Sequence, residues 1–151
     1  MICSGAGAFE SLRLEKGYRS LGTDIHTNYN PYESGLGFTV KLKKDDEFIG
    51  KNALQKIKEK PIEKKLTCMI IDDPEGMALG TEPIYSNGKA VGYVTSTNYG
   101  YFVDKHIVYG YLPTELSEKG NKLEVEYFGK RYPLTVTEEP LLDPENNRLK
   151  S

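Results

Sequence analysis

The second half of the chain alternates apolar and polar side chains with a period of two, the pattern of a strand that buries one face. Leu123, Val125 and Tyr127 fall on one side and two glutamates on the other, so one face points to a core and one to water. Turn signals such as Asn87-Gly88 separate these stretches. Strands are predicted over residues 66–71, 83–86, 90–95, 107–112, 122–127 and 131–137. Short strands with tight turns predict a small antiparallel β-barrel or sandwich.

The first sixty residues follow a helical period instead. Phe9, Leu12 and Leu14 give residues 5–17 an apolar side, and Glu10 and Arg13 are spaced to pair on one helix face. A turn-rich stretch over residues 21–37, a short strand over residues 38–42 and a second helix over residues 49–60 follow, and Pro61 ends the last of these. The chain is therefore predicted to be α+β and β-rich, with one unit over residues 1–60 and a second over residues 61–151. The polar tail, residues 141–151, is expected at the surface.

Composition narrows the classes of protein that remain. Among 151 residues, 38% are hydrophobic and 28% charged, with a net charge of −2, which is typical of a globular protein. The two signs are mixed, so no basic stripe indicates a nucleic-acid partner, and no apolar run is long enough to indicate a membrane partner. Cys3 and Cys68 lack metal-binding or redox spacing and are interpreted as reduced thiols in the cytoplasm or an organelle matrix. Eleven tyrosines without a tryptophan favour half-buried sheet positions over a tyrosine-lined groove.

The residues alone assign no catalytic group. His26 and His106 are far apart and stand beside no serine or cysteine motif, and His26 is expected to be solvated in a polar loop. The acidic pairs, at residues 45–46, 72–73 and 138–139, indicate surface charge, turns or helix capping, and no spacing predicts a metal site. Gly5 and Gly7 are interpreted as a helix start rather than a phosphate cradle. Residues 95–101 (TSTNYGY) are predicted to form a loop, either an ordinary turn or the lining of a site for a planar ligand.

Six segments, taken in chain order, resemble one protein family. Residues 11–19 (SLRLEKGYR) resemble the "LRLE-G" segment of glycine-cleavage T-proteins, and more closely its form in dimethylglycine and sarcosine dehydrogenases. Residues 31–38 (PYESGLGF) resemble "P-EAGLGF", and residues 48–54 (FIGKNAL) resemble "FIGKEAL". Residues 92–100 (GYVTSTNYG), 107–113 (IVYGYLP) and 140–148 (PLLDPENNR) resemble "G-VTSG-YG", "IALGYLP" and the closing "P-DP---R". Nearly the whole chain is therefore similar to the C-terminal region of aminomethyltransferases.

The resemblance implies a fold and a cofactor. Members of this family form three parts around a central channel that holds tetrahydrofolate, which accepts a one-carbon unit. Residues 1–60 are then the remnant of a folate-binding domain and residues 61–151 the C-terminal barrel. The family's catalytic aspartate and pterin contacts precede the "LRLE" segment, so they are expected to be absent here. The chain is expected to be inactive alone, to expose apolar surface in residues 1–60, and to need a missing N-terminal half or self-association.

The resemblance also points to folate-channel residues. Arg13, Glu15 and Tyr18 are the leading positions, with Tyr99 and Tyr101 next, and packing between the two segments is the alternative role. Phe9 stands where T-proteins often have an arginine, which favours a fragment of a dimethylglycine or sarcosine dehydrogenase. FAD is expected only if a dehydrogenase domain lies upstream. The alternatives are a fragment of a stand-alone aminomethyltransferase and a non-catalytic interaction module.

Overall fold

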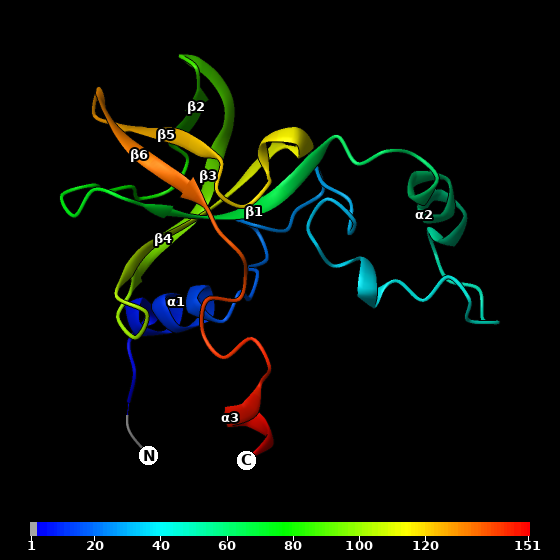
Figure 1. Ribbon diagram of the computed structural model, residues 1–151. Coiled ribbons are helices and arrows are strands. Elements are labelled where there is room, and N and C mark those ends of the chain that lie inside the picture. The colour runs from blue at the N-terminus through cyan, green and yellow to red at the C-terminus, as the bar shows by residue number, and fades with distance from the viewer. Residues whose placement is uncertain (1–2) are drawn as a thin grey trace.

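The centre of the molecule is a closed antiparallel barrel (Figure 1). The computed structural model describes residues 3–151, apart from the side chain of residue 149. Around the barrel the strands follow the order β1-β4-β3-β2-β5-β6. Their bounds are β1 Lys64–Ile71, β2 Pro83–Ser86, β3 Lys89–Gly100, β4 Lys105–Pro113, β5 Lys122–Tyr127 and β6 Lys130–Val136. The predicted small antiparallel barrel is confirmed.

The barrel interior is filled by the apolar side of each strand. Leu123 and Val125 are buried while Glu124 and Glu126 are not, so the predicted alternation along β5 is confirmed. The interior cluster comprises Met69, Ile71, Ala78, Ile84, Val94, Val108, Leu112, Leu123, Val125, Tyr132, Leu134 and Val136. Closure pairs β1 with both β4 and β6, which leaves no edge strand in the sheet.

Two hairpins share one turn geometry. Asn87 and Phe128 both have positive φ, 50° and 47°, and each is followed by a glycine with φ of 77°. Consecutive residues with positive φ are typical of the type I′ turn, which matches the twist of a hairpin. Both predicted hairpins, β2–β3 and β5–β6, are confirmed.

The N-terminal segment covers the outer face of the barrel at β1, β4 and β3. Helix α1 (Ala6–Glu15) packs against β3, and Figure 1 shows it lying below the barrel, with the C-terminal helix α3 (Asn147–Lys150) lower still. Leu14 joins a second apolar cluster, here called the outer cluster, with Leu66, Cys68, Ile107, Tyr109 and Tyr111. Tyr29 stacks on Tyr111, with ring centroids 3.4 Å apart and an interplanar angle of 8°. Tyr109 and Tyr111 are almost wholly buried, deeper than the predicted half-buried positions.

A second part of the N-terminal region extends away from the barrel as an arm. It comprises the short 3-10 helix η1 (Gly37–Thr39) and helix α2 (Lys51–Lys58), and Figure 1 shows α2 well away from the strands. The predicted helix is confirmed, whereas the strand predicted over residues 38–42 is wrong. Phe38, Val40 and Leu42 alternate as a strand would, but no strand of the described chain pairs with them.

One further prediction needs correction. Residues 95–100 continue strand β3, which pairs with β4 as far as Gly100 and Lys105, so the loop predicted over residues 95–101 is wrong. The C-terminal tail lies at the surface as predicted, since its described side chains are exposed or half-buried, and it also contacts α1, because the Leu142 amide donates to the Glu15 carbonyl at 3.0 Å. A 3-10 helix, η2 (Thr114–Leu116), follows β4. The helices of the described residues are all too short or too polar to span a lipid bilayer.

Candidate functional site

Helix α1 and its surroundings gather all five residues that the sequence singled out. Arg13 and Tyr18 line a groove on one side of the helix. Glu15 and Tyr101 line a hollow on the other side. The Ser11 hydroxyl of α1 donates to the Tyr99 carbonyl at 2.7 Å. The structure therefore brings the five together around one helix, although they differ in what they offer a ligand.

Arg13 is a buried anchor between the N-terminal segment and the barrel. Its guanidinium donates to Asp24 Oδ2 at 2.7 Å and to Ser96 Oγ at 2.8 Å, and only 7% of the residue is exposed. The predicted pair with Glu10 is confirmed, at 2.6 Å. Asp24 is also buried and accepts from the Thr95 hydroxyl at 2.5 Å. Since removing one partner of a buried pair typically costs about 3–5 kcal/mol, this network fixes α1 in place.

Glu15 holds the β3–β4 loop and keeps one oxygen unpaired. It is wholly buried, and its Oε1 accepts from the amides of Phe102 and Val103 at 2.6 and 3.2 Å. A side chain at position 100 would place its Cβ 3.0 Å from Glu15 Cγ, so the glycine permits this close approach. Oε2 is buried without a hydrogen-bond partner among the described residues, which is unusual for a carboxylate.

The three tyrosines present aromatic surface to solvent. Tyr101 is 78% exposed and Tyr18 57%. Tyr99 meets Tyr101 edge to face, with centroids 5.1 Å apart. A hydrogen bond between the Tyr99 hydroxyl and Asp104 raises the pKa of Tyr99. These rings can stack on a flat ligand. They lie beside α1 rather than on it, in the segment after the helix, in β3 and in the β3–β4 loop.

We call the first of these depressions the α1 groove. It has a volume of about 350 Å³ and is lined by Phe9, Leu12, Arg13, Lys16, Tyr18, Leu142, Asp143 and Arg148. The guanidinium of Arg148 lies 4.5 Å from the centroid of the Phe102 ring and forms no ion pair among the described residues. The Lys16 ammonium is engaged, because it donates to the Asp143 carbonyl at 2.5 Å. The groove thus combines an apolar wall with one available cation, an arrangement suited to a flat molecule that carries an anionic group.

Sequence reasoning missed the contribution of the tail to this groove. Leu142 and Arg148 belong to the segment that was expected to lie on the surface. The signal that points to them is the closing "P-DP---R" of the resemblance, which ends on Arg148. Asp24 was missed as well, because nothing in a polar turn shows that its aspartate faces inward.

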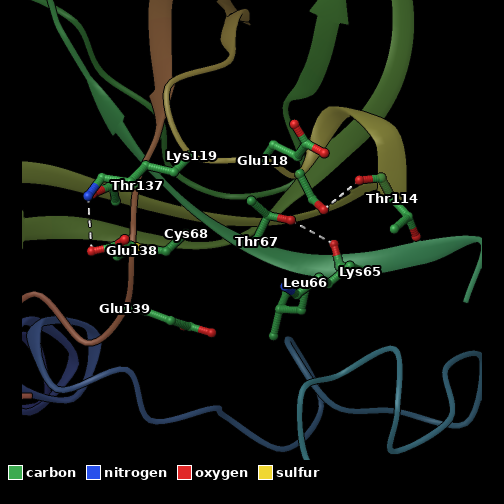
Figure 2. A pocket seen from close by; sticks show the side chains of 11 residues that line it. Lys65, Leu66, Thr67, Cys68, Thr114, Glu118, Lys119, Thr137, Glu138 and Glu139 are labelled. Carbon is green, nitrogen blue, oxygen red and sulfur yellow. Dashed lines mark hydrogen bonds and ion pairs between the residues drawn. The ribbon is translucent and has the colours of Figure 1, made fainter.

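A second cavity, of about 540 Å³, lies where β1 begins and the chain leaves β6 (Figure 2). The acidic pair at residues 138–139 is found here, and its members have different partners: Glu138 pairs with Lys119 at 3.0 Å and Glu139 with Arg19. Cys68 lines the cavity, and burial raises the pKa of its thiol to about 12. The thiol is therefore protonated at neutral pH and is a poor nucleophile.

The histidines form no catalytic arrangement with these groups. His26 is half-buried rather than solvated, with Nε2 3.4 Å from the Tyr93 hydroxyl. His106 Nε2 lies 3.1 Å from the Thr97 hydroxyl, and burial lowers the pKa of this histidine. Within residues 3–151, no three His, Cys, Asp or Glu side chains come together in a way that would hold a metal ion.

Comparison with known proteins places these features in a family. Residues 64–143 match the family described as the glycine cleavage T-protein C-terminal barrel domain, and residues 1–44 match the GCVT N-terminal domain. Human mitochondrial dimethylglycine dehydrogenase is 42% identical over 147 residues, which cover 96% of this chain and 17% of that protein. Mouse mitochondrial sarcosine dehydrogenase is 34% identical, with 99% and 17% covered.

Aminomethyltransferases are also similar. The Prochlorococcus marinus (strain NATL1A) enzyme is 36% identical over 90% of this chain and 36% of its own length. The crystal structure of the glycine cleavage system aminomethyltransferase T from Bartonella henselae superposes with a TM-score of 0.80 at 26% identity, over 90% of this chain and 38% of that one. The chain thus spans about one sixth of the length of its dehydrogenase relatives. From the matched barrel, which accounts for more than half of its residues, the chain belongs to the glycine cleavage T-protein C-terminal barrel domain family.

Proposed function

We propose that this chain serves as the C-terminal part of a tetrahydrofolate-dependent one-carbon enzyme of the dimethylglycine and sarcosine dehydrogenase type, and that its α1 groove contacts the folate. One observation carries the proposal. The groove runs along the helix where the resemblance implies folate contacts, and it places exposed aromatic and apolar side chains beside the Arg148 guanidinium of α3, which forms no ion pair among the described residues.

The groove residues fit one half of a folate molecule. A folate joins a flat pterin to an aminobenzoyl ring and a glutamate with free carboxylates. Phe9, Leu12 and Tyr18 offer the ring an apolar surface, and Arg148 offers a carboxylate a charge-assisted hydrogen bond. The pterin instead needs acceptors for its N–H groups. Asp143, the groove's own carboxylate, already accepts from the amides of Asn147 and Arg148.

We therefore assign the pterin to residues outside this chain. Tetrahydrofolate supplies the nitrogen that accepts the one-carbon unit. The contribution of the chain is to orient the benzoylglutamate part along α1. The α1 groove is open on one side, and transfer of a reactive one-carbon unit requires that water be excluded. Catalysis, the carboxylate that assists it and any FAD are therefore proposed to depend on the remaining five sixths of the length seen in the dehydrogenase relatives.

Residue 9 and the identity to dimethylglycine dehydrogenase support the dimethylglycine dehydrogenase branch over the transferase branch. Phe9 is 66% exposed on the groove, where the resemblance leads one to expect an arginine in T-proteins. Identity to the human dimethylglycine dehydrogenase is 42%, against 36% for the Prochlorococcus aminomethyltransferase. An organelle matrix location accords with the mitochondrial dehydrogenases among the relatives.

A titration with folinic acid, a stable reduced folate, tests the groove. Amide NMR spectra should shift at residues 9, 12, 18 and 142 as folinic acid is added. Arg148→Gln should weaken binding about tenfold, because it removes the charge that meets the carboxylate. Arg131→Gln is the matched control, since Arg131 pairs with Glu124 and Glu126 on the barrel and lines no part of the groove. Absence of shifts up to about 5 mM folinic acid, or equal binding by the two variants, would overturn the assignment.

A further inference from the structure

The α1 groove contains a carboxylate that does not suit an anionic ligand. Asp143 lines the groove together with Arg148, so a ligand carboxylate that approaches Arg148 also meets a second negative charge. Like charges that face each other in a binding site repel and lower the affinity. If Asp143 acted on the ligand directly, it would therefore weaken binding. The contacts of its two carboxylate oxygens point to a different role.

Asp143 caps the short helix that carries Arg148. Its Oδ1 accepts from the Asn147 amide at 2.8 Å, and its Oδ2 accepts from the Arg148 amide at 3.2 Å. These are the first two amides of α3, and among the described residues the N-cap Asn146 offers them no side-chain hydrogen bond. A helix of four residues is not stable in water by itself. The cap that Asp143 supplies therefore determines where α3 begins and how it is oriented.

Asp143 also ties the tail to α1. Lys16, the residue that follows α1, donates to the Asp143 carbonyl at 2.5 Å, and its ammonium lies 3.5 Å from Asp143 Oδ2. The side chains of Lys16 and Asp143 are only 14% and 12% exposed, so this pair is screened less than a pair in open solvent. Figure 1 shows the tail passing α1 before it reaches α3. Asp143 thus connects α3 to α1.

Arg148 is held from another side by an aromatic ring. Its guanidinium carbon lies 4.5 Å from the centroid of the Phe102 ring, and the Phe102 amide donates to Glu15 Oε1 at 2.6 Å. Arg148 itself is exposed. A long exposed side chain loses rotamer freedom when it meets a ligand, and fixing it beforehand lowers that cost. The cap and the ring together fix Arg148 and leave its guanidinium open to a carboxylate.

We propose that Asp143 is a positioning residue of the α1 groove, which holds the Arg148 guanidinium where the carboxylate of the folate meets it. The inference rests on the proposed function and deepens it, because it adds a residue that acts through Arg148. It also fixes the sign of the expected effect. Removing a residue that only repels the ligand tightens binding, whereas removing a positioning residue weakens it.

Titration of the full chain with folinic acid tests this sign. Asp143→Ala should weaken binding about fivefold, and Asp143→Asn, which keeps one acceptor for an amide, about twofold. In a chain that already carries Arg148→Gln, Asp143→Ala should change Kd by less than about twofold, because nothing is left to position. Asp72→Ala is the matched control. Asp72 also pairs with a lysine, Lys122, but it lies on the barrel and lines no part of the groove.

Two results of the titration would overturn the proposal. Equal or tighter binding by Asp143→Ala would show that Asp143 only repels the ligand. An equal loss with and without Arg148→Gln would show that Asp143 acts on the groove as a whole rather than through Arg148.

Side-chain NMR provides a test without folate. The Phe102 ring should displace the proton resonances of the Arg148 side chain, and Phe102→Leu should remove this displacement. Asp143→Ala should remove most of it, and an unchanged displacement would show that the guanidinium is placed without Asp143. If the wild-type chain does not bind folinic acid, the proposed function and the ligand part of this proposal both fail. The Arg148 resonances then still decide whether Asp143 holds the guanidinium.

Discussion

The two N-terminal helices are of similar length but have opposite environments. Helix α1 has ten residues and buries Ser11, Arg13, Leu14 and Glu15. Helix α2 has eight residues and buries none. Its apolar and polar side chains are nevertheless divided more clearly between the two sides of the helix than those of α1. The helix with the better amphipathic pattern is thus the one without a partner.

The difference shows that burial follows the surface a helix meets rather than the pattern it carries. Each buried polar side chain of α1 has at least one hydrogen-bond partner on the barrel or on a loop: Arg13 reaches Ser96 and Asp24, Ser11 reaches Tyr99, and Glu15 reaches two amides through Oε1. Buried charges are tolerated when they are paired and hydrogen-bonded. Helix α2 has apolar residues suited to burial, but within the described chain Leu54 and Ile57 are only partly covered and Ala53 is exposed.

Truncating one apolar side chain in each helix should give the largest difference in the free energy of unfolding between α1 and α2. Leu14→Ala should lower the free energy of unfolding by about 3 kcal/mol, because Leu14 is wholly buried in the outer cluster. Ile57→Ala, in α2, should change it by less than about 0.5 kcal/mol. Urea denaturation of both variants, followed by circular dichroism, measures the two values. Similar losses in both variants would show that α2 packs on the barrel in solution.

The barrel could be predicted from sequence because its signals are local. The alternation of apolar and polar residues in β5 and the Asn87-Gly88 turn signal each involve only a few neighbouring residues. They can therefore be recognised without knowledge of the fold. The strand predicted over residues 38–42 failed for the opposite reason, since a strand also needs a neighbour. The polar side chains of residues 95–100 predict a loop, because they hide the pairing with β4 that extends β3.

The candidate site was predictable only where a resemblance supplied it. The "LRLE" segment led to Arg13 and Glu15, but the pattern does not show that both would be buried as anchors. Asp24 turns inward only because Arg13, Thr95 and Ser20 surround its carboxylate with donors. Arg148 joins the α1 groove only because the tail docks on α1. Both depend on contacts between segments far apart in the sequence.

The dependence of stability on pH tests how tightly α1 and the C-terminal tail shield the outer cluster from solvent. Cys68 belongs to the outer cluster with Leu14, and burial raises the pKa of its thiol to about 12. The unfolded chain loses this proton near pH 8.5, whereas the folded chain retains it. Stability is therefore complete below about pH 8.5 and declines as the pH rises towards 12, by about 2 kcal/mol between about pH 7.5 and about pH 10.

Denaturation of the wild-type chain and of Cys68→Ala at several pH values measures this contribution. The variant is less stable at neutral pH, since it loses buried volume, but its stability should fall less steeply above about pH 8.5. If stability fell equally steeply with pH in both chains, solvent would reach the Cys68 thiol and α1 and the tail would not shield it. Leu14→Ala should hasten alkylation of Cys68 at neutral pH, whereas Ile57→Ala should leave it unchanged.

The smallest expected effect concerns the barrel alone and uses the two hairpins as mutual controls. Phe128 is 92% exposed and has φ of 47°, a conformation that disfavours a bulky residue, while Asn87 occupies the same turn position in the β2–β3 hairpin. Phe128→Asn should raise the free energy of unfolding by about 1 kcal/mol, and Asn87→Phe should lower it by a similar amount. Neither change should alter the alkylation of Cys68 through local opening, because both lie away from the outer cluster. Phe128 meets Tyr127 edge to face, with ring centroids 4.7 Å apart. If Phe128→Asn destabilises the protein, this aromatic contact outweighs the backbone strain at position 128, and the rings rather than the turn geometry stabilise the hairpin tip.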